Sequence, residues 1–398
     1  MIVAGVLAPV TDAAALWDGR LELFVSEAVT HDDNVFRLSS ASDSAAVLGS
    51  SSKGDTSYVT SFGFNLDVPV SRQRLLAGLS LNDTRYRRFT VLNLDGHEGR
   101  AAWQWQVGDD LGGQLGYTES FALASLANIQ SGVQSSTPNT IKITNAYLNA
   151  AYKLTPRWQL RGEASRARQS NSVAERQVND ISVDSSDLAF SYVTPAANQI
   201  GLNMRVADAS FPSRQFIGGI PFDNAYRQKN IAVVADWTIT AHSHLSARAG
   251  RVSRSYAQLP QRDFDGETYH AAYDWKPTGK LTLTAMAQRD ISATEQVNVG
   301  FVLAKRFGLY PTLKLTDKIS WSGSLENSNR EYAGDPGLVL GTVAPRSERV
   351  RSTGTTLSYR PTASVTLFLG LRRETRTATV DFGDYVAHVL SVSGRLAF

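Results

Sequence analysis

Residues 58–68 read "YVTSFGFNLDV", and their pattern decides how the rest of the chain is interpreted. From Tyr58 to Val68 every second side chain is apolar, aromatic or threonine, and the side chains between them include Ser61, Gly63 and Asn65. Because successive side chains of a β-strand point to opposite sides, this period of two predicts a strand with one apolar and one polar face.

The same alternation recurs along the chain, at 145–154, 230–239, 281–288 and 365–372. No stretch has the 3.6-residue period of a convincing amphipathic helix. No run of about 18 apolar residues is present to form a membrane-spanning helix. The sequence therefore predicts an all-β protein.

The composition sets further limits on function. With 42% hydrophobic residues, 19% charged residues and a mean hydropathy of −0.21, the chain is too polar for a bundle of membrane helices. The formal net charge is +3 and the basic residues are scattered, so we expect no nucleic-acid partner. Cysteine is absent, which fits an envelope protein that needs no disulfide.

The connections between the alternating runs fall into two classes that themselves alternate. The short ones lie at 68–73, 107–111, 154–158, 194–199, 240–244, 276–280, 315–318 and 360–364. The long polar ones lie at 30–57, 82–96, 122–140, 168–181, 208–225, 256–266, 290–296, 327–350 and 373–383. Short turns at one edge and long loops at the other are typical of an outer-membrane β-barrel. We predict a transmembrane antiparallel up-and-down barrel of about 18 strands, an even number as such barrels require.

The first residues, "MIVAGVLAPVTDAAA", are similar to the apolar part of a secretory signal peptide, with a cleavage site before Leu16. No lysine or arginine precedes Arg20, so the basic segment that normally begins such a peptide is missing. We predict a leader at 1–15 and a single barrel at 16–398, in the outer membrane of a Gram-negative bacterium. The long loops are expected outside and both termini in the periplasm.

Aromatic residues indicate how the barrel sits in lipid and how it is assembled. Six tryptophans lie close to a tight turn or a strand end, and we expect them to form an interfacial girdle in contact with outer-membrane lipid. They are Trp103, Trp105, Trp158, Trp237, Trp275 and Trp321. The chain ends on Phe398 after an alternating run that begins at Tyr385. A terminal aromatic on such a strand resembles the signal recognised by the barrel-assembly machinery. We therefore predict this machinery as a partner.

Two stretches repeat one pattern: "LDGHEGRAAWQW" at 94–105 and "FDGETYHAAYDW" at 264–275. Each begins with Asp-Gly after one residue, continues through Ala-Ala and an aromatic, and ends on Trp. Either one good solution for a strand was used twice, or hairpins were duplicated. Neither interpretation predicts a binding site in these residues.

The same regions carry a family resemblance. "HDDNVFRLSS" at 31–40, "YRRFTVLNLDGHEGRAAWQWQVGDDLGGQLGY" at 86–117 and "RDFDGETYHAAYDWKPTGKLTLTAMAQRD" at 262–290 resemble the EpsL proteins. These are outer-membrane barrels of exosortase-linked exopolysaccharide gene clusters, related to the broader β-barrel porin 2 group. The resemblance covers nearly the whole chain after the leader, and it implies a role in producing or exporting an exopolysaccharide. It supplies no functional residues.

No catalytic or cofactor motif emerges, so we expect neither an enzyme nor a cofactor. His242 and His244 share one tight turn without carboxylate or cysteine support, which favours turn solvation over a metal site. Asp32, Asp33 and Asn34 offer oxygen ligands for calcium, but loop capping is the favoured interpretation because the rest of a calcium loop is missing.

The polar faces of the strands are the remaining candidate site. An 18-stranded barrel is wide enough for an aqueous channel, and charges on its walls select solutes. The residues expected to line the lumen are Asn149, Lys153, Arg161, Glu163, Asn203, Arg205, Asp236, Arg248, Asp274, Glu326 and Arg372.

Three functions follow from this arrangement. The leading hypothesis is a passive conduit for an exopolysaccharide, working with separate periplasmic polysaccharide-export proteins. The second is a general or substrate-selective diffusion porin, with 122–140 or 327–350 as a constriction loop folded inside. The third is a structural anchor of an envelope complex.

Overall fold

A computed structural model describes residues 17, 19–126, 138–217, 219–292, 301–333, 346–379 and 381–398. Eighteen strands form one antiparallel sheet, and a separate two-stranded ribbon joins β10 (Gln215–Ile217) to β11 (Ile220–Phe222). Among the described residues no helix has the length and apolarity to cross a membrane.

The first nine strands of the sheet are β1 (Leu21–Asp32), β2 (Asp55–Val70), β3 (Gln73–Tyr86), β4 (Leu94–Val107), β5 (Leu111–Leu123), β6 (Thr140–Thr155), β7 (Trp158–Asn171), β8 (Ile181–Val193) and β9 (Gln199–Ser210). The other nine are β12 (Tyr226–Thr240), β13 (Ser243–Tyr256), β14 (Phe264–Trp275), β15 (Leu281–Ser292), β16 (Phe301–Lys314), β17 (Ile319–Ala333), β18 (Arg346–Tyr359), β19 (Val365–Ala378) and β20 (Tyr385–Ala397). Each pairs with its neighbours in order, so the predicted barrel of about 18 strands is confirmed.

The barrel closes where the first and last strands meet. β1 pairs antiparallel with β20, from Phe24 opposite Ala397 to Asp32 opposite Val389. Beyond the ladder, the Phe398 N–H donates to the Leu23 carbonyl at 2.8 Å, and the Leu23 N–H donates back at 3.2 Å. Closure removes free strand edges, which lipid cannot solvate.

The two faces of the wall differ as the alternation predicts. Large apolar side chains stay exposed on one face, including Phe62 at 57%, Leu202 at 58% and Ile231 at 56%. A protein surrounded by water would bury such side chains, whereas a barrel in a bilayer presents them to lipid. The opposite face carries the polar residues and points into the lumen.

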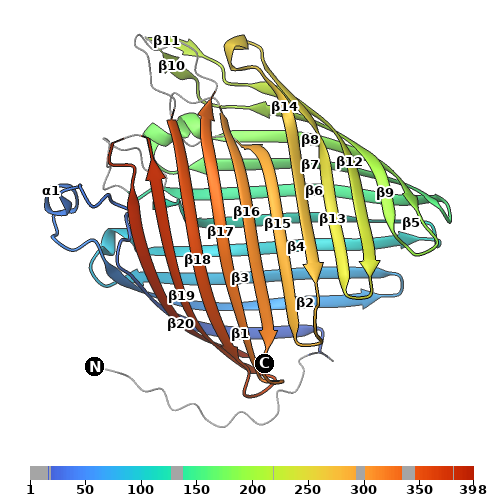
Figure 1. The fold of residues 1–398 in the computed structure, drawn as a ribbon, viewed down its shortest axis with the longest axis horizontal. Coiled ribbons are helices and arrows are strands. Elements are labelled where there is room, and N and C mark those ends of the chain that lie inside the picture. The colour runs from blue at the N-terminus through green and yellow to red at the C-terminus, as the bar shows by residue number, and fades with distance from the viewer. Residues whose placement is uncertain are drawn as a thin grey trace.

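The barrel has a short-turn end and a long-loop end (Figure 1). The long-loop end carries α1 (Ser44–Leu48) and the β10–β11 ribbon. In the described parts of the long connections lie three 3-10 turns: η1 (Thr90–Leu92), η3 (Ala174–Asn179) and η4 (Pro260–Arg262). Strands β15–β20 cross in front of β3–β8 in this view, because tilted strands on opposite walls run in different directions (Figure 1).

The long connections are less purely polar than predicted. Val35, Phe36 and Leu38, from the connection after β1, form a buried cluster with Phe89 and Leu92 near η1. The ring centroids of Phe36 and Phe89 lie 4.9 Å apart in an edge-to-face arrangement. Strands also extend further than expected; β3 continues to Tyr86, past the predicted loop start at residue 82. This cluster gives the long-loop end a small apolar core of its own.

The repeated sequence pattern belongs to a larger structural repeat. β3 and β13 begin at Gln73 and Ser243 and end at Tyr86 and Tyr256, a constant offset of 170 residues. The η1 and η4 turns that follow, and the strands β4 and β14, begin with the same offset.

The loop geometry repeats as well. The Asn93 side chain accepts a hydrogen bond from the Tyr86 N–H at 2.7 Å, and the Asp263 side chain accepts one from the Tyr256 N–H at 2.8 Å. β5 and β15 keep the same offset at Leu111 and Leu281. Duplication of hairpins predicts spacing that is preserved over several elements, which one reused strand does not explain.

The wall is irregular where β14 meets β15. These strands pair only from Tyr269 opposite Arg289 to Trp275 opposite Leu283. Beyond Arg289, Ile291 of β15 and Phe301 of β16 form a buried cluster with Val252 of β13. By alternation Ile291 belongs to the outward row and Val252 to the inward row, so the outer face of β15 here packs against the inner face of the neighbouring strands.

Candidate functional site

All eleven residues predicted to line the lumen lie on the inward face. Strand register places them together: Asn149 faces Glu163, and Arg205 faces Asn230, each pair on the side opposite the exposed apolar rows. They are distributed around the wall from β6 to β19 instead of converging on one point. The lumen wall is therefore polar, without the compact cluster that catalysis needs.

Several inward carboxylates are engaged by neighbouring side chains. Asp236 lies 2.9 Å from His244 Nε2, and Asp274 accepts a hydrogen bond from Thr284 at 2.5 Å. Glu326 accepts one from Tyr310 at 3.0 Å. These contacts fix the carboxylates against the wall, and they place His244 in a strand-to-strand contact rather than a metal site.

A cavity of about 330 Å³ opens on the inward wall between β9 and β15. Its charged lining is four arginines, one histidine and one carboxylate: Arg205, Arg248, Arg254, Arg289, His270 and Asp290. Tyr226, Gln228 and Asn230 of β12 supply part of the polar surface between them. Of the predicted lumen residues, the structure brings only Arg205 and Arg248 to this cavity.

Two groups of these lining residues are not among the predicted lumen residues. The repeated pattern at 264–275 predicts no binding site, and the structure places three of its residues, Thr268, Tyr269 and His270, in the lining of the cavity. Arg289 was not identified because alternation assigns it to the lipid-facing row. The end of the β14–β15 pairing at Tyr269 and Arg289 brings this side chain to the cavity.

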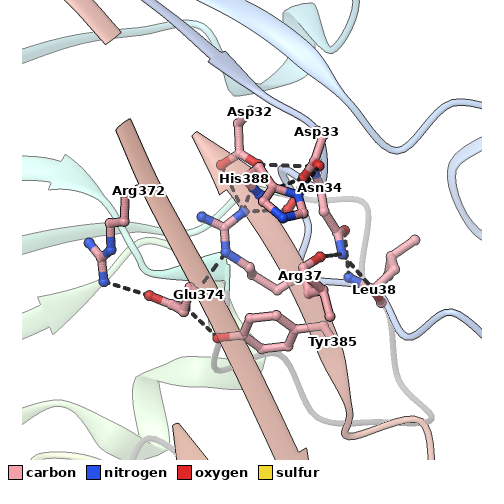
Figure 2. Close-up of polar contacts among 10 residues, drawn as sticks. Asp32, Asp33, Asn34, Arg37, Leu38, Arg372, Glu374, Tyr385 and His388 are labelled. Atoms are coloured by element: carbon pink, nitrogen blue, oxygen red, sulfur yellow. Dashed lines mark hydrogen bonds and ion pairs between the residues drawn. The ribbon is translucent and has the colours of Figure 1, made fainter. Parts of the chain in front are cut away.

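A second polar cluster holds the connection after β1 to the neighbouring strands β19 and β20 at the barrel seam. Arg37 donates to both Asp32 carboxylate oxygens, at 2.9 and 2.7 Å, and its Nε lies 3.8 Å from Glu374 Oε1 (Figure 2). Glu374 also accepts hydrogen bonds from Arg372 at 2.5 Å and from the Tyr385 hydroxyl at 2.6 Å. These residues come from β1, β19, β20 and the loop, so they tie one long connection to the inner wall.

The Asp32–Asn34 motif supports this connection. The Asn34 side chain donates to the carbonyls of Leu38 and Val386, at 2.8 and 3.0 Å, and accepts from the Leu38 N–H at 2.8 Å. Asp33 lies 2.7 Å from His388 Nδ1 on β20. The motif shapes the loop, and the described residues contain no group of three or more side chains suited to a metal ion. Of the two segments predicted to fold inside, 122–140 and 327–350, the central parts at 127–137 and 334–345 lie outside the described residues. The described ends of 327–350 belong to the strands β17 and β18.

The predicted girdle and terminal residues occupy matching positions. All six tryptophans alternate onto the outward face near the short-turn end, as in the pairing of Trp103 with Leu75 and of Trp321 with Leu357. Trp158 stacks on Phe190 with ring centroids 4.8 Å apart. Phe398 follows the last strand at the barrel seam.

Comparison with known proteins agrees with this architecture. Residues 244–398 match the family model described as "Putative beta-barrel porin 2". No curated protein sequence matches the chain.

Solved structures of similar fold come from Pseudomonas. The outer membrane protein OpdK of Pseudomonas aeruginosa aligns with a TM-score of 0.52 at 10% identity, over 96% of this chain and 99% of that one. OccK2 (OpdF) of the same species, solved with glucuronate, gives 0.51 at 12% identity over 95% and 98%. A BenF-like porin of Pseudomonas fluorescens Pf-5 gives 0.51 at 11% identity over 95% and 98%.

At such identities the likeness concerns the fold alone. The chain is a closed, 18-stranded, porin-like β-barrel of the Gram-negative outer membrane, and its last 155 residues are similar to the β-barrel porin 2 family.

Proposed function

We propose that this barrel is a passive, substrate-selective diffusion channel for small hydrophilic solutes. The observation that supports it most is the closed wall of 18 strands, whose inward face is polar and whose outward face is apolar. A barrel of this size leaves an aqueous interior, and fixed charges on its wall discriminate among solutes. The OccK2 structure of similar fold was solved with glucuronate, a small hydrophilic solute of the kind proposed.

Electrical recording in planar bilayers tests this function. The purified barrel is expected to give stable conductance steps in potassium chloride, with a reversal potential that departs from zero under a salt gradient. Liposomes containing the barrel should swell with monosaccharides faster than empty ones. Absence of both conductance and swelling would contradict a diffusion channel.

A second candidate is the exit conduit for an exopolysaccharide, acting with periplasmic export proteins. The EpsL-like stretches at 31–40, 86–117 and 262–290 favour it. Aromatic rings on the inward face could stack on sugar rings. Phe368 keeps 39% of its surface exposed for such stacking, whereas the Phe24 ring is covered by Arg395, whose Cζ lies 3.9 Å from the ring centre. In a deletion strain, an exit conduit predicts less polysaccharide outside and accumulation in the periplasm. Normal secretion would leave the diffusion channel as the function.

The orientation completes the proposal. We place the long loops outside and both termini in the periplasm, since the six tryptophans then mark the periplasmic interface. An envelope anchor, the third alternative, would act through the loops and conduct nothing. Exchanging the long loops while keeping the lumen separates it from both conduits, because only an anchor should lose its function.

A further inference from the structure

We propose that the cavity lined by Arg205, Arg248, Arg254 and Arg289 binds the oxyanion group, carboxylate or phosphate, of a small organic anion. This inference rests on the proposed diffusion channel and names its preferred class of solute. The cavity lies on the lumen wall, so a solute reaches it without entering the protein interior.

The state of Arg254 is the first evidence. Arg254 is only 3% exposed. Its Nε and Nη2 both donate to the Gln228 side-chain oxygen, at 3.0 and 2.7 Å, and its Cζ lies 4.1 Å from the centre of the Tyr226 ring. Its Nη1 is buried and has no hydrogen-bond partner within the described part of the chain. A guanidinium held on two sides with one donor unsatisfied is prepared for an external acceptor, because a buried unpaired donor is costly.

A second arginine that lines the cavity also has a buried, unsatisfied donor. Arg289 Nε is also buried without a partner in the described residues. Arg289 comes from β15 and Arg254 from β13, so the two unsatisfied donors come from different strands that line the same cavity. Two arginines on different strands can contact one oxyanion together, and their planar forks match carboxylate and phosphate geometry.

The nearby carboxylates leave the positive charge largely uncompensated. Asp187 lies opposite Arg205 in the β8–β9 register, but it accepts a hydrogen bond from Asn203 instead. Asp290 accepts the N–H of Ile291 at 2.8 Å. Over the described ranges, none of the four arginines lies within 4.0 Å of a carboxylate oxygen in an ion pair. Four guanidiniums and one lining carboxylate therefore attract anions.

The size and wetness of the site limit the ligand. A volume of about 330 Å³ falls at the lower end of small-molecule sites, which hold about 300–1,000 Å³. It suits a single sugar acid or sugar phosphate rather than a polymer chain. The lumen stays open to water, so binding should be weak and exchange fast, as passage through a channel requires.

The test uses glucose and two anionic derivatives that differ from it at carbon 6: glucuronate, with a carboxylate, and glucose 6-phosphate, with a phosphate ester. Isothermal titration of the whole barrel in detergent should detect glucuronate, glucose 6-phosphate or both, and no binding of glucose. Arg248→Gln and Arg254→Gln should each lower the affinity for the anion about tenfold, which is the effect of losing one charge-assisted hydrogen bond. Arg100→Gln is the matched control, since Arg100 lies on the inward face of β4 outside the cavity and bonds to Asn65.

The outcomes separate the site from the channel. A preference for one of the two anions supports the proposal and identifies the group. Equal binding of all three sugars would overturn the proposal, because no anion site would then exist. An equal loss of anion affinity in Arg100→Gln would also overturn it, in favour of a diffuse positive charge along the lumen. Retained heat-modifiable mobility on gels verifies that Arg254→Gln folds, and Arg248→Gln carries the test if it does not. Intact anion binding without conductance would refute the channel function alone.

Discussion

Arg37 joins the connection after β1 to the inner wall of the barrel, with its Nε 3.8 Å from Glu374 Oε1 on β19. Both side chains are mostly shielded, at 17% and 14% exposure. Arg37 also holds Asp32 at 2.7 Å, so one guanidinium bridges the end of β1 and the face of β19. The connection is thereby fixed at the long-loop end, on the side of the barrel opposite the arginine-lined cavity.

Removing this bridge should free the connection. Arg37→Ala leaves the shielded Asp32 without its cation and removes the contact to Glu374, which keeps its ion pair with Arg372. We expect noisier single-channel current with more frequent closures in planar bilayers. Arg72→Ala is the control, because its ion pair with Asp109 at the short-turn end is exposed, at 55% and 85%. Unchanged current noise in Arg37→Ala would show that this contact does not restrain the loop.

The two faces of β2 should respond differently to the same charge. Phe62→Arg places a guanidinium in lipid near the middle of the strand, which costs about 2–4 kcal/mol in a transmembrane barrel. Ser61→Arg places it in the wet lumen and should change the free energy of unfolding by less than about 1 kcal/mol. Urea unfolding in lipid vesicles measures both. Equal destabilisation by the two variants would contradict the assigned inward and outward faces.

The tryptophan girdle can be located by quenching. With six tryptophans near the short-turn end, fluorescence in brominated lipids should be quenched more strongly by bromines close to the headgroup than by those near the chain ends. Trp17 lies outside the barrel wall and is 60% exposed, so Trp17→Phe should sharpen the difference. Stronger quenching from the chain ends would place the tryptophans away from the interface.

The terminal phenylalanine should matter for assembly more than for stability. Phe398 joins Leu23 through two backbone hydrogen bonds, which Phe398→Ser keeps. If the barrel-assembly machinery recognises the aromatic ring, this variant should accumulate unassembled in cells. It should still refold in detergent without the machinery, at the yield of the unaltered chain. A fall in both the assembled amount in cells and the refolding yield in detergent would indicate that Phe398 has a role in the fold itself.

Much of the fold was predictable because a lipid-facing wall imposes a strict rule on sequence. Every second residue of a strand faces the same medium, so the run from Tyr58 to Val68 already contains the two faces of β2. The spacing of turns then gave the strand number and the two unlike ends. The inward positions of Arg205, Arg248 and Arg372 followed from the same period.

The cavity could not be predicted in this way. Arg254 and Arg289 line one cavity although alternation assigns them to opposite faces of the wall, and the β14–β15 pairing ends beside it at Tyr269 and Arg289. The bridge from Arg37 to Glu374 joins residues more than 330 positions apart through a loop without periodicity. The sequence by itself determined which side of each strand faces lipid, since that depends on local alternation. Tertiary structure alone decided which inward charges come together, since that depends on strand register, closure and the path of the loops.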